Sequence, residues 1–395
     1  MTSRRIAVAY DCLFPYTTGG GERQYRAFAE AMVDEGRAVD YLTAVQWDEK
    51  PEGLPFSVTP VSRRLTLYSP DGTRRIPAAL QYAWGLFRTL RRRRGAYDAI
   101  VVSALPVFNV LAARLALVGS GTRIVVDWLE VWRRPQWVEY SGKATGTVAW
   151  ALQRLAIAAS PLATCHSGLS ARRLRSEGLR SEPLVSAGLI GSDAAPAVVR
   201  PAARPPFVLY AGRHIPDKQV ESLPGAVRAA REQLPDLRLV ILGDGPSSGA
   251  VRRAVADAGG EEWTEMPGFV EQEVLDTLMG DAACLVNPSR REGYGLVVVE
   301  SSRYGTPVVL VEHEGNASTE LVEEGTNGRI APSASPEHLG SAIVDAVRGG
   351  DSLRNSTSAW YQQAVTTRTI RRTVEAILAT IDAPVGQHPR KEQKP

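Results

Sequence analysis

The sequence predicts an α/β fold with two domains, each built around a parallel sheet. The chain has 395 residues, which is more than one ordinary hydrophobic core accommodates. Short apolar runs alternate with segments of helical periodicity, a pattern typical of parallel strands connected by helices. The order of apolar run, glycine-containing loop and helix occurs at the start of the chain and again after residue 206. We therefore expect the same doubly wound architecture twice.

The composition restricts the class of protein. Apolar residues make up 44% and charged residues 23% of the chain, values typical of a water-soluble globular protein. No run of about 18 apolar residues could span a membrane, and the apolar run after Arg5 is too short for a signal peptide. The three cysteines lie far apart and predict neither a disulfide framework nor a zinc site. These features favour a cytoplasmic protein.

The first domain is predicted over residues 1–187. A helix at 22–35 ends at Gly36, a residue suited to a helix C-terminus. It follows Gly19-Gly20-Gly21, so the chain opens with a βαβ unit, although the glycine spacing does not match the dinucleotide fingerprint. We expect strands at 5–10, 39–43, 56–61, 99–103, 123–127 and 162–165, and helices at 22–35, 76–90, 107–118, 149–159 and 169–175.

Residues 188–206 are rich in proline, glycine and alanine and predict a linker. The second domain is expected over residues 207–365, and residues 384–395 form a polar tail that we expect to be disordered. We expect strands at 207–211, 237–242, 282–286 and 307–311, a turn followed by a helix from 266–270, and helices at 219–233, 250–258, 296–304, 338–347 and 352–381.

The charge is distributed unevenly along the chain. Residues 1–186 carry 25 Lys and Arg against 16 Asp and Glu, a net charge of +9, and the remainder has a net charge of −6. One interpretation is the ordinary unevenness of a protein surface. The other is that the first half binds an anionic partner.

The helix expected at 76–90 leaves a similar choice open. Its apolar face is followed by arginine at all four positions 91–94. Such a stripe either packs in the core or makes peripheral contact with a membrane surface. The residues in register are Leu80, Trp84, Phe87 and Leu90.

The segment 287–300 predicts an anion-binding site. It follows the strand at 282–286 and contains Gly293 and Gly295 before a helix. The first amides of a helix lack internal partners and carry partial positive charge. Glu292 and Glu300 add two carboxylates, which suit a ligand that carries hydroxyl groups beside its phosphates. A nucleotide-sugar has both groups.

Two cations precede this segment in the second domain. Arg213 and Lys218 straddle the turn after the strand at 207–211, so both can reach one anion. His214 either assists at the phosphate or is an ordinary buried histidine, which is the simpler interpretation.

An unusual acidic and aromatic segment follows the strand at 123–127. Ligands of open parallel sheets bind beyond the carboxyl ends of the strands, so we expect Asp127 and Glu130 to face a ligand crevice. Their carboxylates suit the hydroxyls of a sugar or an amine. An aromatic cluster accompanies them, made of Trp128, Trp132, Trp137 and Tyr140. The alternative is that the tryptophans only pack against the crossover.

The order of these motifs resembles the family-4 retaining glycosyltransferases of the GT-B fold, over about residues 5–383. The strongest match is E-x7-E from Glu292 to Glu300, together with R-x4-K from Arg213 to Lys218. Further matching positions are Gly19-Gly20-Gly21-Glu22, Gly212, Gly243-Asp-Gly-Pro246, Gly268-Phe-Val270, Glu320 and Asn327-Gly328.

The resemblance implies two facing Rossmann-like domains with parallel sheets, the first on the acceptor side and the second binding the nucleotide-sugar. A final helix at 366–383 would cross back to the first domain. Arg213 and Lys218 would hold the donor diphosphate, Glu292 would contact the hydroxyls of the transferred sugar, and Glu300 would contact the ribose.

Backbone groups complete the donor site that the resemblance implies. Gly20 and Gly21 would close on the phosphates from the first domain. The remaining donor-binding residues would be Gly243, Phe269, Val270, Gly293, Tyr294, Gly295, Leu296 and Val297.

The chain departs from the family at two positions. Many members place a histidine after the strand that here ends at Asp127, where it contacts the donor sugar; that role is open to Asp127 or Glu130. The glycine that commonly follows the phosphate-binding lysine is Gln219 here.

The expected chemistry needs no cofactor. No D-x-D-type metal motif is apparent, and fixed cations and amides can stabilise the charge of a departing nucleoside diphosphate, so we expect metal independence. The family implies front-face retention, in which the donor phosphate accepts the acceptor's proton.

The favoured function is a retaining glycosyltransferase that uses a UDP- or GDP-sugar and glycosylates a hydroxyl of a small molecule, for example an aminocyclitol in a natural-product pathway. One alternative is a lipid-linked or membrane glycan acceptor, with the protein peripheral at the inner face of the membrane. Further alternatives are a sugar-nucleotide epimerase of related fold and a non-catalytic binding protein. Abundant arginine and scarce lysine are associated with GC-rich bacteria. We expect no nucleic-acid partner.

Overall fold

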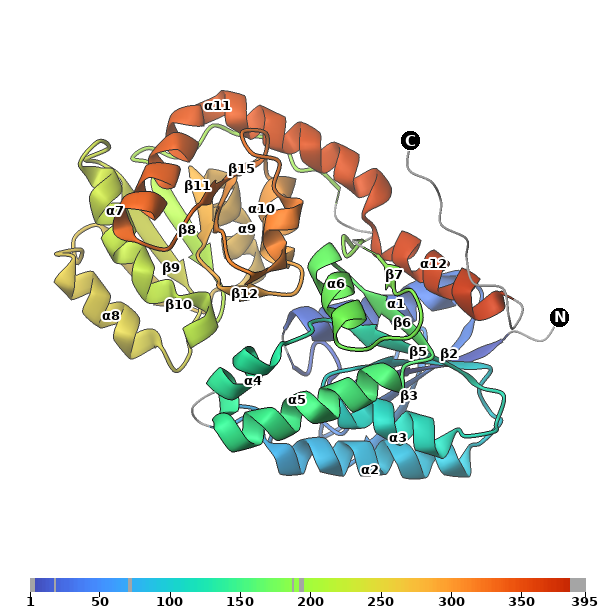
Figure 1. The fold of residues 1–395 in the computed structure, drawn as a ribbon. Coiled ribbons are helices and arrows are strands. Elements are labelled where there is room, and N and C mark those ends of the chain that lie inside the picture. Colours follow the sequence, from blue (N-terminus) through green and yellow to red (C-terminus); the bar gives the residue numbers. More distant parts are fainter. Residues whose placement is uncertain (1–3, 18, 70–72, 187, 192–194, 384–395) are drawn as a thin grey trace. The chain divides into compact units, whose positions relative to one another are not determined.

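The computed structural model describes residues 4–17, 19–69, 73–186, 188–191 and 195–383. The chain forms two compact units, which are coloured along the sequence in Figure 1. Unit 1 contains the described residues of 1–67, 74–192 and 368–395, and unit 2 contains those of 68–73 and 193–367. The two parallel sheets confirm the expected α/β architecture of the GT-B type.

Unit 1 is built on a seven-stranded parallel sheet with the order β3-β2-β1-β4-β5-β6-β7. The order reverses direction between β1 and β4, which is the topology of a doubly wound sheet. The strands are β1 Arg5–Ala9, β2 Ala38–Ala44, β3 Ser57–Ser62, β4 Ala99–Ser103, β5 Arg123–Trp128, β6 Leu162–Cys165 and β7 Leu184–Val185.

Helices cover both faces of this sheet. Side chains from α2, α3, α5 and α6 form one core with the sheet, and α12 packs beside α1 (Figure 1). The helix α12 follows unit 2 in the sequence and belongs to unit 1. The helices are α1 Gly20–Asp34, α2 Ile76–Arg92, α3 Phe108–Ala116, α4 Arg134–Ser141, α5 Lys143–Ala158, α6 Gly168–Ser176 and α12 Ile370–Asp382.

Unit 2 has a six-stranded parallel sheet with the order β10-β9-β8-β11-β13-β15, and β12 pairs with β14 beside it. The strands are β8 Phe207–Ala211, β9 Arg238–Leu242, β10 Thr264–Gly268, β11 Cys284–Asn287, β12 Arg291–Glu292, β13 Val308–Val311, β14 Gly315–Asn316 and β15 Gly328–Ala331. The helices are η1 Pro216–Lys218, η2 Val220–Ser222, α7 Leu223–Arg231, α8 Ser248–Asp257, α9 Gln272–Asp281, α10 Leu296–Arg303, η3 Ala317–Leu321 and α11 Pro336–Thr367.

Two expected helices differ from the structure. The helix expected at 219–233 begins only at Leu223, because Gln219 adopts a left-handed conformation with φ of 46° and separates two short 3-10 turns. The helix expected at 352–381 is divided at Thr369, whose side chain accepts a hydrogen bond from the amide of Arg372 and caps α12. The division lets the chain leave unit 2 and enter unit 1.

Strands β10 and β15 and helix α4 were not predicted. Neither strand contains a run of apolar residues, so neither has the signal of a buried strand. No helix within the described ranges is long and apolar enough to cross a membrane.

Candidate functional site

The structure brings Lys218 and Glu292 together at the carboxyl edge of the unit 2 sheet. Lys218 ends the turn η1 after strand β8, and Glu292 lies in β12, between β11 and α10. The Nζ atom of Lys218 forms an ion pair with Oε2 of Glu292. The two side chains are 21% and 18% exposed, so they remain open to a ligand. A phosphate would meet the cation here, and a sugar hydroxyl would meet the carboxylate.

A second ion-pair set holds these two loops against each other. The carboxylate of Asp217 accepts from Arg291 at 2.5 Å and from Arg290 at 3.2 Å. The amide of Arg290 also donates to the carbonyl of Asp217 at 3.0 Å. Asp217 precedes Lys218, and Arg291 precedes Glu292, so the contact fixes the spacing of the ion pair. The sequence motif did not identify Asp217, because its partners lie more than 70 positions away.

Gly295 begins helix α10 in a left-handed conformation, with φ of 101°. A Cβ atom at this position would lie 2.4 Å from the Cβ of Ser318, so only glycine fits. No side chain caps the helix. The amides of Leu296 and Val297 therefore lie where a helix N-terminus attracts an anion. The preceding residues Gly293 and Tyr294 are buried.

The cation Arg213 lies exposed after strand β8, with its carbonyl accepting from the hydroxyl of Tyr210 at 3.0 Å. Gly243 is glycine because its φ is 99° and a Cβ would lie 2.1 Å from the carbonyl oxygen of Gly212. The two loops thus contact each other at the same edge. Arg213 lies beside the site, and no described contact joins it to Lys218.

His214 is held in place by a neighbouring side chain. It is buried, and its Nδ1 lies 2.8 Å from the hydroxyl of Ser248. Burial lowers the pKa of His214 below its ordinary value, so the ring is neutral and not a cation for a phosphate. Burial and the contact with Ser248 are in keeping with an ordinary buried histidine, and a role at the phosphate stays a prediction.

The remaining predicted donor residues have different exposures. Phe269 is 77% exposed, while Val270 and Glu300 are half-buried. Glu300 lies in the second turn of α10, on the helix that Gly295 begins.

In unit 1, the triple glycine precedes helix α1, which has no side-chain cap. A Cβ atom at Gly21 would lie 2.5 Å from the hydroxyl of Tyr10, so the close approach of that ring requires glycine. Tyr10 stacks on Tyr25 with ring centroids 4.4 Å apart. Gly20 is the first residue of the helix, and a role at the phosphates remains a prediction for both glycines.

Asp127 does not face a crevice, contrary to expectation. Its side chain is fully buried. It accepts from the hydroxyls of Tyr25 at 2.7 Å and Thr164 at 2.6 Å, and from Gln24 at 3.2 Å. With these partners and His166, the carboxylate has no surface left for an acceptor.

His166 is the partner that sequence reasoning missed. Its Nε2 lies 2.9 Å from Oδ1 of Asp127, and its Nδ1 lies 3.0 Å from the carbonyl of Ser186. Burial alone would lower the pKa of His166, but the charge and hydrogen bond of Asp127 outweigh it and raise that pKa above its ordinary value. Burial opposes ionisation of Asp127 as well, yet the charge and hydrogen bond of His166 hold its pKa below the ordinary value. The two residues form a buried ion pair that anchors the first turns of α1 through Gln24 and Tyr25.

Glu130 is half-buried, and its Oε2 accepts a hydrogen bond from Nε1 of Trp132 at 2.7 Å. The ring of Trp132 lies 4.8 Å from that of Trp137 and 5.2 Å from that of Tyr140. All three rings are partly exposed. Gln153 holds the cluster, because its Oε1 accepts from the amide of Trp132 and from Nε1 of Trp137. Of the aromatic cluster predicted from the sequence, Trp132, Trp137 and Tyr140 are in mutual contact; from here on the aromatic cluster means these three rings, with Glu130 beside them.

Two predicted groups of apolar residues each contain a member that is buried in the core. Trp128 is fully buried in the core of unit 1, so it is not part of the aromatic cluster. On α2, Leu90 is also fully buried, whereas Leu80 is 48% and Trp84 is 61% exposed. The predicted stripe therefore divides into a core residue and a solvent-facing part.

Two family models match the chain, one in each half. Residues 19–188 match the glycosyl transferase 4-like domain, and residues 192–363 match glycosyl transferases group 1. Among curated proteins, the chain is 30% identical over 138 residues to alpha-D-kanosaminyltransferase of Streptomyces kanamyceticus, which covers 35% of each chain. It is 30% identical over 160 residues to D-inositol 3-phosphate glycosyltransferase of Jonesia denitrificans, covering 38% of this chain and 37% of the relative. The chain thus spans little more than a third of the length of these relatives.

Solved structures share the fold over nearly the whole chain. Sucrose-phosphate synthase of Thermosynechococcus elongatus superposes with a TM-score of 0.76 and 16% identity, covering 96% of this chain and 99% of that one. HepE of Anabaena, solved with UDP and glucose, superposes with a TM-score of 0.70 and 17% identity, covering 96% and 99%. At such identities the likeness shows the fold alone.

Proposed function

Because this chain belongs to the glycosyltransferases, with a 4-like domain followed by a group 1 domain, we propose that it transfers a sugar from a nucleoside-diphosphate-sugar to a hydroxyl of a small molecule. The observation that carries the proposal is the pairing of Lys218 with Glu292 beside the N-terminus of α10. A cation and helix amides bind phosphate, and a carboxylate accepts from sugar hydroxyls. The site thus offers the two kinds of group that a nucleotide-sugar requires.

Donor binding exchanges the partners of this ion pair. Lys218 turns from Glu292 to the diphosphate, with Arg213 as the second cation, and Glu292 accepts from the hydroxyls of the sugar. Glu300, on the same helix, binds the ribose. Asp217 and Arg291 keep the two loops in place during the exchange, because their contact does not involve the ligand.

Transfer proceeds with retention of configuration at the anomeric carbon. The bond between that carbon and the phosphate oxygen breaks, and its electrons leave with the nucleoside diphosphate. The acceptor oxygen bonds to the carbon on the same face and passes its proton to a phosphate oxygen. Lys218 and the α10 amides stabilise the charge that grows on the leaving group, so the reaction requires no metal.

The acceptor is a polyhydroxylated molecule that carries an amine, such as an aminocyclitol. The aromatic cluster supports this class, because ring faces attract cations and pack against the C–H faces of sugars, and Glu130 supplies a carboxylate for an amine. The similarity to a kanosaminyltransferase is in keeping with it. Asp127 and Glu130 were both expected to face a ligand; because Asp127 is buried, we assign this role to Glu130.

The test is a transfer assay with the full chain. UDP- and GDP-sugars are incubated with amine-bearing cyclitols. Products are detected by mass spectrometry, and their anomeric configuration is determined by NMR. We expect a mass increase of one sugar, retained configuration and full activity in EDTA. Lys218→Met and Glu292→Ala should abolish transfer, while Lys143→Met, at the start of α5 in the other unit, should not. An NDP-sugar isomerised without any acceptor would instead indicate an epimerase, and binding without turnover would indicate a non-catalytic protein.

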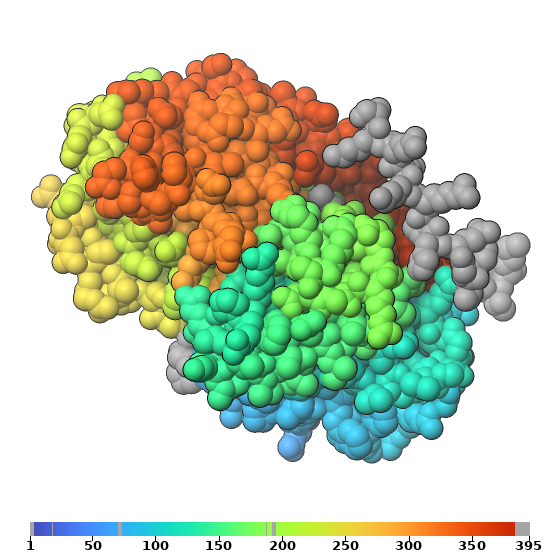
Figure 2. Space-filling model, viewed as in Figure 1, coloured from blue at the N-terminus to red at the C-terminus, as the bar shows by residue number. Residues whose placement is uncertain are grey.

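A lipid-linked acceptor at a membrane is the second candidate, and the surface of unit 1 favours it. Ile76, Leu80 and Trp84 on α2 are 52%, 48% and 61% exposed, and the arginines at 91–94 end or follow the same helix. Two apolar side chains of α5, Val148 and Leu155, are also more than half exposed. Figure 2 shows one face of the molecule in space-filling form. Exposed apolar side chains on a helix that ends in arginines suit an anionic bilayer.

Sedimentation with anionic vesicles separates the two acceptor classes. If the acceptor is lipid-linked, the wild type should sediment, Trp84→Ser should sediment less, and Val198→Ser, at an exposed position in unit 2, should behave as the wild type. No sedimentation would leave the small-molecule acceptor as the proposal.

A further inference from the structure

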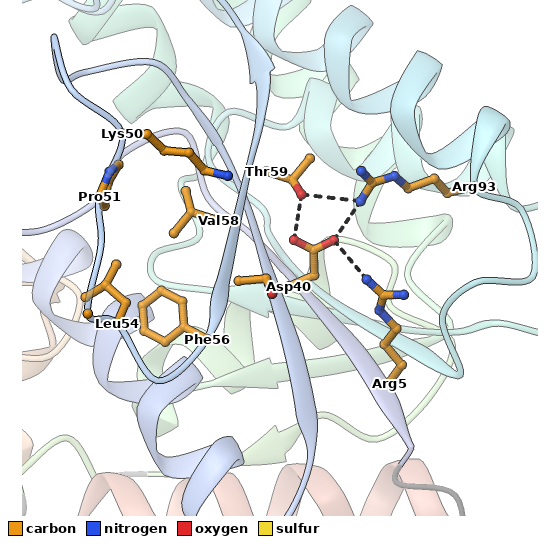
Figure 3. Close-up of a pocket in the computed structure, with 11 residues that line it drawn as sticks. Arg5, Asp40, Lys50, Pro51, Leu54, Phe56, Val58, Thr59 and Arg93 are labelled. Carbon is orange, nitrogen blue, oxygen red and sulfur yellow. Dashed lines mark hydrogen bonds and ion pairs between the residues drawn. The ribbon is translucent and has the colours of Figure 1, made fainter.

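We propose that unit 1 contains a second anion-binding site, for a small phosphorylated ligand, in the cavity at the amino ends of β1, β2 and β3 (Figure 3). The cavity has a volume of about 330 Å³. Small-molecule sites begin at about 300 Å³, so the space suits an organic phosphate and not only an inorganic ion.

The lining of the cavity is strongly cationic. Arg5, Lys50 and Arg93 line it, and Asp40 is the only carboxylate among the described lining residues. These four side chains sum to a net charge of +2, which matches a phosphomonoester dianion. Glu49 and Glu52 flank Lys50 in the sequence, but neither lines the cavity.

Asp40 organises the arginines and is not itself free to repel a ligand. Its side chain is 1% exposed. Its Oδ2 accepts from Nη1 of Arg93 at 2.8 Å and from the hydroxyl of Tyr97 at 2.5 Å, and its Oδ1 accepts from Thr59 at 2.7 Å. The guanidinium of Arg5 lies 3.9 Å from the same carboxylate. Figure 3 shows the two arginines held on one side of Asp40.

Tyr97 keeps this arrangement intact at neutral pH. Burial, with the hydrogen bond to Asp40, raises the pKa of Tyr97 to about 12. The phenol therefore stays protonated and continues to donate to Asp40. The Asp40 carboxylate thus holds two arginines in place, while three hydrogen-bond donors stabilise its own negative charge.

Lys50 is the cation available for a ligand. No ion pair or hydrogen bond joins its ammonium group to the part of the chain that the structure describes. Its side chain extends from the loop before β3 toward Thr59 and Asp40 (Figure 3). An anion between Lys50 and Arg93 would receive charge-assisted hydrogen bonds from both.

Four apolar residues also line the cavity, namely Pro51, Leu54, Phe56 and Val58. Phe56 and Val58 are buried, so the apolar surface that they offer a ligand is small. The cavity therefore suits a ligand that is polar throughout, such as a sugar phosphate, whose phosphate meets the cations.

The cavity is separate from the features that the proposed reaction uses in unit 1. Arg5 begins β1 and Ser57 begins β3, so the cavity lies at the amino edge of the sheet. The glycine loop, the Asp127–His166 pair and the aromatic cluster all lie at or beyond the carboxyl ends of strands. A ligand in the cavity is therefore not the acceptor of the proposed transfer.

The experiment is calorimetric titration of the full chain carrying Lys218→Met, so that the phosphate site proposed in unit 2 is weakened. The probes are glucose 6-phosphate, inorganic phosphate and glucose. We expect glucose 6-phosphate to bind, inorganic phosphate to bind more weakly and glucose not to bind. Adding Lys50→Met should lower the affinity for glucose 6-phosphate about tenfold, which is the loss expected for one charge-assisted hydrogen bond.

Two further variants decide the result. Arg5→Met should weaken binding as Lys50→Met does, whereas Lys143→Met should leave it unchanged. The proposal would be overturned if adding Lys50→Met left the affinity for glucose 6-phosphate unchanged. It would also be overturned if no phosphate bound at millimolar concentration. Neither outcome bears on donor binding in unit 2, so the proposed function is tested separately.

Discussion

At the scale of single residues, the buried Asp127–His166 pair gives unit 1 a distinctive dependence on pH. The raised pKa of His166 means that its contribution is complete below about pH 6.5, the ordinary value, and is lost as the pH rises through the folded-state value. The lowered pKa of Asp127 means that its contribution is complete above about pH 4 and is lost as the pH falls through its folded-state value. The pair therefore stabilises most between these limits.

We expect His166→Gln to lower the free energy of unfolding by about 3–5 kcal/mol near pH 5–6, because it leaves a buried carboxylate without its partner. The difference from the wild type should shrink as the pH rises above about 6.5. Urea unfolding of both proteins across this range measures it. A difference that is independent of pH would contradict the ion pair.

At the scale of elements, Gln219 explains why the expected helix of unit 2 starts late. Among the described residues, it is the one non-glycine with positive φ, at 46°. A left-handed conformation costs an L-residue about 1–2 kcal/mol, and glycine avoids this. Position 219, where the family that the sequence resembles commonly has glycine, is thus one where the backbone conformation favours glycine.

Gln219→Gly should raise the free energy of unfolding of unit 2 by about 0.5–1 kcal/mol, since relief of the strain exceeds the extra freedom of the unfolded chain. The matched control is Gln233→Gly, in the turn after α7, which should lower it. Thermal unfolding of the two variants reports the sign. Destabilisation by both would mean that the Gln219 side chain contributes contacts that outweigh the strain.

The elements also show what the sequence could predict. The loop before α10 was predictable because a strand, two glycines and a helix follow one another in a single stretch. The network around Asp127 was not, because Tyr25, Thr164 and His166 come from other elements and meet only in the folded sheet. The position of Asp127 near the carboxyl end of its strand was predictable from the sequence, but the direction of its side chain was not.

At the scale of the whole molecule, the chain's last helix belongs to the unit that its first strand begins. The helix α12 buries Val374 and Ile377 completely in unit 1. Arg4 and Arg37 both form ion pairs with Asp382 at its end. Unit 1 is therefore incomplete without residues that follow unit 2.

Ile377→Ala should lower the free energy of unfolding of unit 1 by about 2–5 kcal/mol through the cavity that it leaves. Arg372→Ala, at an exposed position of the same helix, should change it by less than about 0.5 kcal/mol. Circular dichroism during urea unfolding provides the comparison. Equal stability of the two variants would show that α12 is not part of the core of unit 1.

Calorimetric titration with UDP and with GDP tests the proposed donor site most directly. We predict that the wild type binds one of them, that Lys218→Met weakens it at least tenfold, as expected for one charge-assisted contact to phosphate, and that Lys143→Met binds as the wild type does. Failure of both nucleotides to bind, or equal binding by the Lys218 variant, would contradict the assignment of the Lys218–Glu292 site to a nucleotide-sugar.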